Sequence, residues 1–167
     1  MPNYYNGDIT LIDFPTNALN FIPQVCNNIG KYGAGLSGAL SAKWPKIEQS
    51  FSQWVIGEGK GCSGPYELGH IQMVSVTPSL AIVNMIAQKG VRARYNPKPL
   101  QYKQLEMCLI RLFANLSQIS CRFADGHIKI WCPKIGAGLA GGDWDNIQER
   151  ISHWFDRPEF ELNYVFN

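Results

Sequence analysis

Apolar residues recur along the chain with two different periods, and the changes of period predict where strands and helices lie. Short runs rich in β-branched and aromatic residues are typical of strands, which we expect at residues 4–10, 21–27, 70–76, 80–86, 127–132 and 160–166. Apolar positions three and four apart are typical of helices, which we expect at residues 36–44, 45–55, 99–119 and 143–154. This order predicts an α/β fold of three layers, with helices on both faces of a mixed central sheet and ligands at the carboxyl ends of its strands.

Two glycine-rich segments, residues 30–38 and 136–142, each follow a predicted strand and lead into a predicted helix. Such a turn brings backbone N–H groups and a helix N-terminus close to an anion. One such segment is typical of an ordinary tight turn, but both contain the sequence GAGL, which favours two walls around one polyphosphate. Neither has the GxxxxGK[ST] pattern, and the first has no acidic partner in a helix or strand about twenty residues on, so a P-loop kinase and a Rossmann dehydrogenase are disfavoured.

Length and charge narrow the class of protein further. The 167 residues fit a single domain spanning residues 1–167. A net charge of +2 gives no strong nucleic-acid signal. No acidic residue occurs between Asp13 and Glu48, so the only charges around the first glycine-rich segment are Lys31, Lys43 and Lys46, which suits an anionic ligand.

The five cysteines are widely spaced and form no CxxC pair, and the three histidines are scattered, so we expect no metal site. Cys26 stands beside the first glycine-rich segment, and its apolar neighbours favour a buried thiol over a reactive one. The N-terminus lacks the pattern of a signal peptide, and no apolar stretch has the length of a membrane span. We therefore expect a cytoplasmic protein that does not enter a membrane.

Three motifs in fixed order carry a resemblance to a known family. They are Gly7-Asp8-Ile9-Thr10, the run Val25-Cys26-Asn27-Asn28-Ile29-Gly30 followed by Gly33-Ala34-Gly35-Leu36, and the stretch from Pro133 to Trp144. In order and spacing they resemble the macrodomain family, whose members bind ADP-ribose. Within that family the chain looks most similar to the ADP-ribose-1″-phosphate phosphatases and their bacterial and phage relatives.

The resemblance implies a monomer that takes ADP-ribose or its 1″-phosphate and needs no cofactor. It assigns ligand binding to Asp8, Ile9, Asn27, Asn28, Gly33, Ala34, Gly35, Leu36, Ser37, Ile135, Gly136, Ala137, Gly138, Leu139, Ala140 and Phe166. The residues alone leave other roles open: Asp8 suits either the adenine amine or a turn, and Asn27 suits either the terminal ribose or a strand cap. Tyr164 or Phe166 would flank the adenine, and the alternative for each ring is packing in the core. Tyr32 has no obvious core to join and suits a cover for the ligand.

The candidate catalytic residues are Asn27, Gln24 and Gln88. Gln24 stands where some phosphatase members carry a histidine, and Gln88 and Ala140 stand where other branches carry a lysine and an aspartate. Three hypotheses therefore stay open. The first is an enzyme, either a phosphatase or an ADP-ribosyl hydrolase acting on a modified macromolecule. The second is a binding module without turnover. The third is a structural or partner-binding protein that keeps the fold and has lost the ligand.

Overall fold

A six-stranded sheet forms the middle of the molecule. The structure, a computed structural model, describes all of residues 1–167. The spatial order is β1-β6-β5-β2-β4-β3, and only the β3–β4 pair is antiparallel. The strands are β1 (Asn3–Asn6), β2 (Leu19–Asn27), β3 (Ile71–Thr77), β4 (Leu80–Gln88), β5 (Ile128–Cys132) and β6 (Phe160–Phe166).

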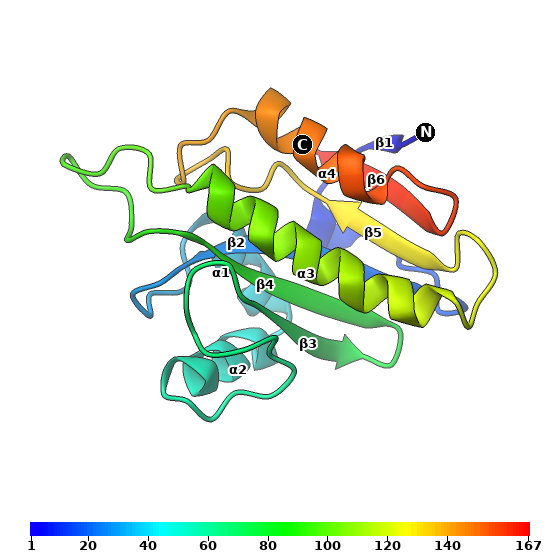
Figure 1. Ribbon diagram of the computed structural model, residues 1–167, viewed down its shortest axis with the longest axis horizontal. Coiled ribbons are helices and arrows are strands. Elements are labelled where there is room, and N and C mark those ends of the chain that lie inside the picture. The colour runs from blue at the N-terminus through cyan, green and yellow to red at the C-terminus, as the bar shows by residue number, and fades with distance from the viewer.

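Four α-helices cover both faces of this sheet (Figure 1). They are α1 (Gly35–Lys43), α2 (Lys46–Val55), α3 (Tyr102–Ser120) and α4 (Trp144–Phe155). The long helix α3 crosses one face and packs on α4, whereas α1 and α2 lie on the other. The predicted three-layer α/β/α fold with a mixed sheet is therefore confirmed. None of the helices combines the length and apolar character needed to cross a membrane.

The two core layers follow from alternation along the central strands. In β2, Phe21 joins the cluster beneath α3 and α4, whereas Ile22 joins the cluster beneath α1. In β4, Val83 and Ile82 divide in the same way. Because both faces are covered, the central strands are apolar on successive positions rather than alternately polar. This burial fixes the register, since a slip of one residue would exchange the two faces.

Two element boundaries differ from the sequence prediction by three residues or more. The first strand ends at Asn6 rather than at residue 10, because the Asp8 carboxylate accepts hydrogen bonds from the Thr10 N–H (2.9 Å) and hydroxyl (2.7 Å) and closes a short 3₁₀ helix, η1 (Ile9–Leu11). The helix expected from residue 99 begins at Tyr102. The backbone of residues 99–101 instead bonds to the end of β4, as in the Gln101 N–H donated to the Ala87 carbonyl at 2.8 Å.

Three buried amide side chains cross the sheet on the α1/α2 face. The strand register places Gln24, Asn84 and Gln72 side by side on β2, β4 and β3. Gln24 Nε2 donates to Asn84 Oδ1 (2.7 Å), Asn84 Nδ2 donates to Gln72 Oε1 (3.1 Å), and Gln72 Nε2 donates to the Ser50 carbonyl (2.9 Å). All three residues are fully buried. These three amides, which we call the amide ladder, form a row of polar groups within an apolar layer. They carry no charge, and each is hydrogen-bonded.

We expect Asn84→Ala to destabilise the protein by about 2 to 4 kcal/mol, because it leaves a buried donor on Gln24 and a buried acceptor on Gln72 without their partner. Asn115→Ala is the matched control, because the Asn115 amide is exposed on α3 and bonds only to the Arg111 carbonyl. The control should change stability by no more than about 0.5 kcal/mol. Urea unfolding followed by circular dichroism measures both. Equal stabilities for the two variants would contradict a structural role of the ladder.

Candidate functional site

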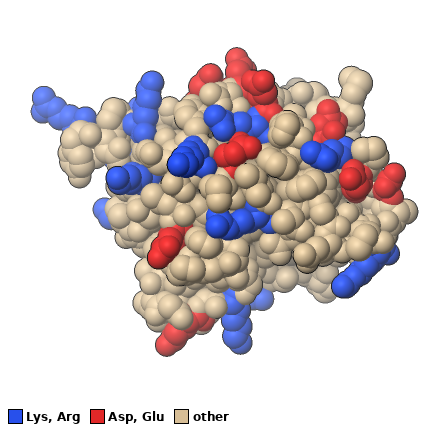
Figure 2. All heavy atoms as spheres, viewed as in Figure 1, with Lys and Arg blue, Asp and Glu red and all other residues tan.

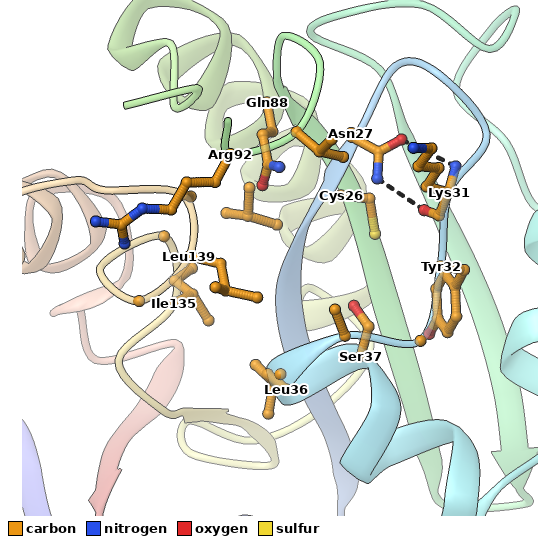
Figure 3. A pocket seen from close by; sticks show the side chains of 18 of the residues that line it. Cys26, Asn27, Lys31, Tyr32, Leu36, Ser37, Gln88, Arg92, Ile135 and Leu139 are labelled. Carbon is orange, nitrogen blue, oxygen red and sulfur yellow. Dashed lines mark hydrogen bonds between the residues drawn. The ribbon is translucent and has the colours of Figure 1, made fainter. Parts of the chain in front are cut away.

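A cavity of about 940 Å³ opens where β2 and β4 end, and the two glycine-rich segments form its walls (Figure 3). The first segment contributes Leu36 and Ser37, and the second contributes Leu139 from across the opening, with Ile135 immediately before it. The complete lining is Val25, Cys26, Asn27, Lys31, Tyr32, Gly33, Ala34, Gly35, Leu36, Ser37, Gln88, Val91, Arg92, Lys134, Ile135, Gly136, Gly138, Leu139 and Ala140. The two segments thus share one cleft.

The charges around this cavity have a single sign. Lys31, Arg92 and Lys134 line it, and no acidic residue does. They come from three separate loops, after β2, β4 and β5. A concave site whose charged side chains are all positive, with glycine backbone in both walls, attracts anions and raises their local concentration. The cavity is therefore built for a negatively charged ligand.

Asn27 and Tyr66 shape the first wall. Asn27 Nδ2 donates to the Lys31 carbonyl at 2.7 Å, and Asn27 Oδ1 accepts from the N–H groups of Ile29 and Lys31, both at 3.1 Å. The Tyr66 hydroxyl donates to the Asn27 carbonyl at 2.6 Å and accepts from the Gly30 N–H at 2.9 Å. The side chain of Asn27 therefore caps the strand and holds the turn after β2, and one of its amide hydrogens is still free to face the cavity.

The amide ladder reaches the same wall through Gln24. Gln24 Nε2 also donates to the Tyr32 hydroxyl (2.7 Å), and Gln24 Oε1 accepts from the Ser37 hydroxyl (2.9 Å). Gln24 does not line the cavity, and protein groups occupy both ends of its amide. The expectation that Tyr32 has no core to join is wrong, because its ring packs 5.0 Å from that of Phe51 and burial raises the pKa of its phenol. Gln24 positions the wall rather than facing the ligand.

The second wall is pinned by close backbone packing. The Gly142 N–H donates to the Gly136 carbonyl at 2.8 Å, and the Leu100 N–H donates to the Ala140 carbonyl at 3.1 Å. A Cβ atom on Gly142 would lie 2.7 Å from the Gly136 oxygen and 2.4 Å from a Leu100 methyl. A Cβ atom on Gly138 would meet nothing within 4 Å. Gly142 thus packs against the protein, while Gly138 faces the open cavity.

The predicted ligand-binding residues separate into two groups. The cavity lining contains the larger group: Asn27, Gly33, Ala34, Gly35, Leu36, Ser37, Ile135, Gly136, Gly138, Leu139 and Ala140, together with the catalytic candidate Gln88. Outside the lining lie Asp8, Ile9, Asn28, Ala137 and Phe166, together with Gln24. Asn28 turns away to accept a hydrogen bond from the Gly90 N–H at 2.9 Å.

Asp8, Ile9 and Phe166 lie together at the ends of β1 and β6, because the Gly7 N–H donates to the Phe166 carbonyl at 2.7 Å. Lys134 connects this corner to the cavity, since it lines the cavity and its Nζ lies 5.0 Å above the Phe166 ring. Of the two rings that we considered for adenine, Tyr164 is fully buried and Phe166 is partly exposed. Tyr164 is therefore a core residue, whereas Phe166 keeps part of its surface exposed although its ring also contacts Tyr4 and Trp144.

The sequence prediction did not name the lining cations Arg92 and Lys134, and it gave Lys31 only as one of three charges that suit an anionic ligand. Lys134 stands inside the matched third motif, so its position was a usable signal. Arg92 follows β4 in a basic run, and only the folded chain places it beside the two glycine-rich walls.

The cavity offers few groups for proton transfer. No His, Asp or Glu lines it, and burial raises the pKa of the Cys26 thiol. Gln88 Nε2 donates to the Gly90 carbonyl at 3.1 Å, which leaves Gln88 Oε1 free to accept from a water molecule. Backbone donors and three cations are suited to binding a phosphate, and the free Gln88 oxygen is suited to orienting a water molecule.

We expect Gly142→Ala to destabilise the protein by about 1 to 3 kcal/mol, since the added methyl overlaps a backbone oxygen. Gly138→Ala is the control, because it adds the same methyl to the same segment in open space. Thermal unfolding of both variants distinguishes the two positions. A Gly142→Ala protein that melts with the wild type would contradict the packed geometry of the second wall.

Proteins of known structure share this architecture over the full chain. A macrodomain protein from Streptomyces coelicolor has a TM-score of 0.76 and 27% sequence identity, with coverage of 100% of this chain and 99% of that one. A Bacteroides thetaiotaomicron protein of unknown function has a TM-score of 0.82 and 27% identity, with coverage of 100% and 98%.

A curated relative extends the similarity to sequence. The ADP-ribose 1″-phosphate phosphatase of Candida albicans is 23% identical over 171 residues, which cover 99% of this chain and all of that protein. No family model matches the chain. The shared fold and the full-length coverage nevertheless agree, and they confirm the resemblance: this chain is a macrodomain in fold.

Proposed function

We propose that the cavity binds ADP-ribose and that the protein hydrolyses an ADP-ribose derivative, with ADP-ribose-1″-phosphate as the first candidate. The observation that carries the proposal is the pairing of two glycine-rich walls with three cations and no acidic residue around one cavity. A diphosphate suits this site, because backbone N–H groups and cations bind phosphate oxygens without side-chain bulk. The similarity to the Candida albicans phosphatase supports the same choice.

The residues on either side of the cavity indicate where the adenine and the terminal ribose of ADP-ribose would lie. We assign the adenine to the corner formed by Asp8, Ile9 and Phe166, where the second Asp8 oxygen has no hydrogen-bond partner. We assign the terminal ribose to the opposite side, near Asn27 and Gln88, which both line the cavity. Lys134 lies between the cavity and Phe166, which suits contact with the phosphate nearer the adenosine.

Hydrolysis in this cavity depends on the substrate itself. Water forms the new P–O bond, the bond from phosphorus to the 1″ oxygen breaks, and the released oxygen takes up a proton. Because no histidine or carboxylate lines the cavity, a phosphate oxygen of the substrate accepts the proton of the attacking water and passes it to the released 1″ oxygen. Gln88 Oε1 orients that water, and the cations and backbone N–H groups stabilise the charge on the phosphoryl group.

A second candidate function is binding of ADP-ribose without turnover. The absence of His, Asp and Glu from the lining favours it, since many hydrolases place such a group beside the reacting atom. Both candidates share the same ligand and the same cavity, and they differ in whether phosphate is released.

We expect ADP-ribose to bind with micromolar affinity, on the order of −8 kcal/mol, and AMP to bind more weakly because it reaches only one end of the site. Calorimetry measures binding, and phosphate release from ADP-ribose-1″-phosphate measures turnover. Gly138→Val should leave the protein folded and abolish binding, since its side chain enters the open space of the cavity. A wild-type protein that binds neither ADP-ribose nor AMP would overturn the proposal. Binding of ADP-ribose by the wild type without phosphate release would favour the second candidate.

Asp8→Ala tests the adenine assignment. It should weaken ADP-ribose binding by about 1 to 3 kcal/mol if the carboxylate pairs with the adenine amine. The substitution also removes the two bonds to Thr10, so the melting temperature must be measured beside the affinity. Thr10→Val is the control, because it removes the hydroxyl bond to Asp8 and keeps the carboxylate. If Asp8→Ala melts earlier but binds as the wild type does, Asp8 is a turn residue only.

A further inference from the structure

The segment between β4 and α3 forms a small projecting hairpin of residues 89–98, which we call the basic hairpin (Figure 1). Ala93 and Asn96 exchange backbone hydrogen bonds at 3.1 and 2.9 Å, so Arg94 and Tyr95 occupy its tip. Asn96 Nδ2 donates to the carbonyls of Lys89 and Val91, both at 3.0 Å. The hairpin is therefore closed by its own hydrogen bonds.

The base of the basic hairpin is tied to the body of the protein beside the cavity. Asn28 Oδ1 accepts from the Gly90 N–H at 2.9 Å, and the Lys89 N–H donates to the Pro99 carbonyl at 2.9 Å. Arg92 lines the cavity, whereas Arg94 and Tyr95 lie at the tip. The hairpin thus leads outward from the mouth of the cavity.

Four of the fifteen basic residues of the chain lie in this short segment: Lys89, Arg92, Arg94 and Lys98. All four are exposed, and no ion pair of the protein involves any of them. No acidic residue occurs between Glu67 and Glu106 in the sequence. In Figure 2 the projection carries blue spheres and no red ones. The nearly neutral net charge of the chain hides this concentration of positive charge.

The tip also presents an aromatic ring with nothing to cover it. Tyr95 is 93% exposed and makes no aromatic contact within the chain. Exposure of a whole tyrosine ring leaves apolar area in water, and the hydrogen-bonded tip holds that ring away from the body. A ring beside two or more cations is the combination that single-stranded nucleic acids bind, since bases stack on the ring while phosphates meet the cations.

We propose that the basic hairpin is a binding surface for single-stranded nucleic acid. Charge alone would also suit an acidic peptide, but the Asp and Glu side chains that carry its charge have no ring to stack on Tyr95, whereas every nucleotide carries a base. Lys98 and Asp143 line the same small neighbouring cavity but form no ion pair. The surface is distinct from the cavity assigned to ADP-ribose, although Arg92 belongs to both.

Binding of a fluorescein-labelled oligothymidylate, followed by fluorescence anisotropy over a range of salt concentrations, tests the proposal. Tyr95→Ala should weaken binding about ten-fold through the loss of stacking. Arg94→Glu/Lys98→Glu should reduce the slope of log K against log salt by about 1.4, since each lost phosphate contact on a single strand removes about 0.7. An RNA of equal length should compete, and polyglutamate of equal charge should compete poorly.

Lys60→Glu/Arg122→Glu is the matched control, because it makes the same change of charge at exposed positions outside the basic hairpin. It should bind the oligonucleotide nearly as the wild type does. Equal losses in this control, an unaltered affinity of Tyr95→Ala, or equal competition by polyglutamate would each overturn the proposal. ADP-ribose calorimetry on the same variants should be unchanged. A wild-type protein that binds the oligonucleotide but not ADP-ribose would refute the proposed function and leave this inference standing.

Discussion

The cavity depends on a line of hydrogen-bonded amides buried in the sheet. Gln24, Asn84 and Gln72 carry no charge, yet their amide groups cannot be left unpaired in an apolar layer without a large cost in free energy. Their partners are therefore fixed, and two of them, Tyr32 and Ser37, belong to the first wall of the cavity. The position of a surface loop is in this way set by the register of three interior strands.

The two walls are held by different means. The first wall is held by side chains, namely the Gln24 amide, the Asn27 amide and the Tyr66 hydroxyl, while its glycines keep the surface toward the cavity bare. The second is held by backbone contacts so close that Gly142 has no room for a methyl group. Both arrangements fix the backbone of the walls by contacts within the protein, so the turns need little further ordering to meet a ligand.

The sequence predicted the layers and the two walls because each depends on local patterns. Glycine at residues 33, 35, 136 and 138, next to apolar runs of strand length, is enough to indicate a bare turn at the end of a strand. Gln24 was predicted as a catalytic candidate, but it lies buried behind the first wall, and only strand register shows that Asn84 and Tyr32 use its amide. The late start of α3 could not be read either, because residues 99–101 bond to β4 across a distance in sequence.

The net charge of the chain does not reveal where its positive charges are concentrated. A net charge of +2 describes a nearly neutral protein, yet Lys31, Arg92 and Lys134 converge on one cavity and four cations crowd the basic hairpin. Acidic residues are not missing from the chain but lie elsewhere, and three of them form the ion pairs of the surface. Since electrostatic attraction falls off over roughly a nanometre in physiological salt, an anion near the cavity responds to the local cations and not to the distant carboxylates. The function of this surface is therefore decided by where the charges lie, and Arg92, which belongs to both the cavity and the hairpin, makes the two positive regions continuous.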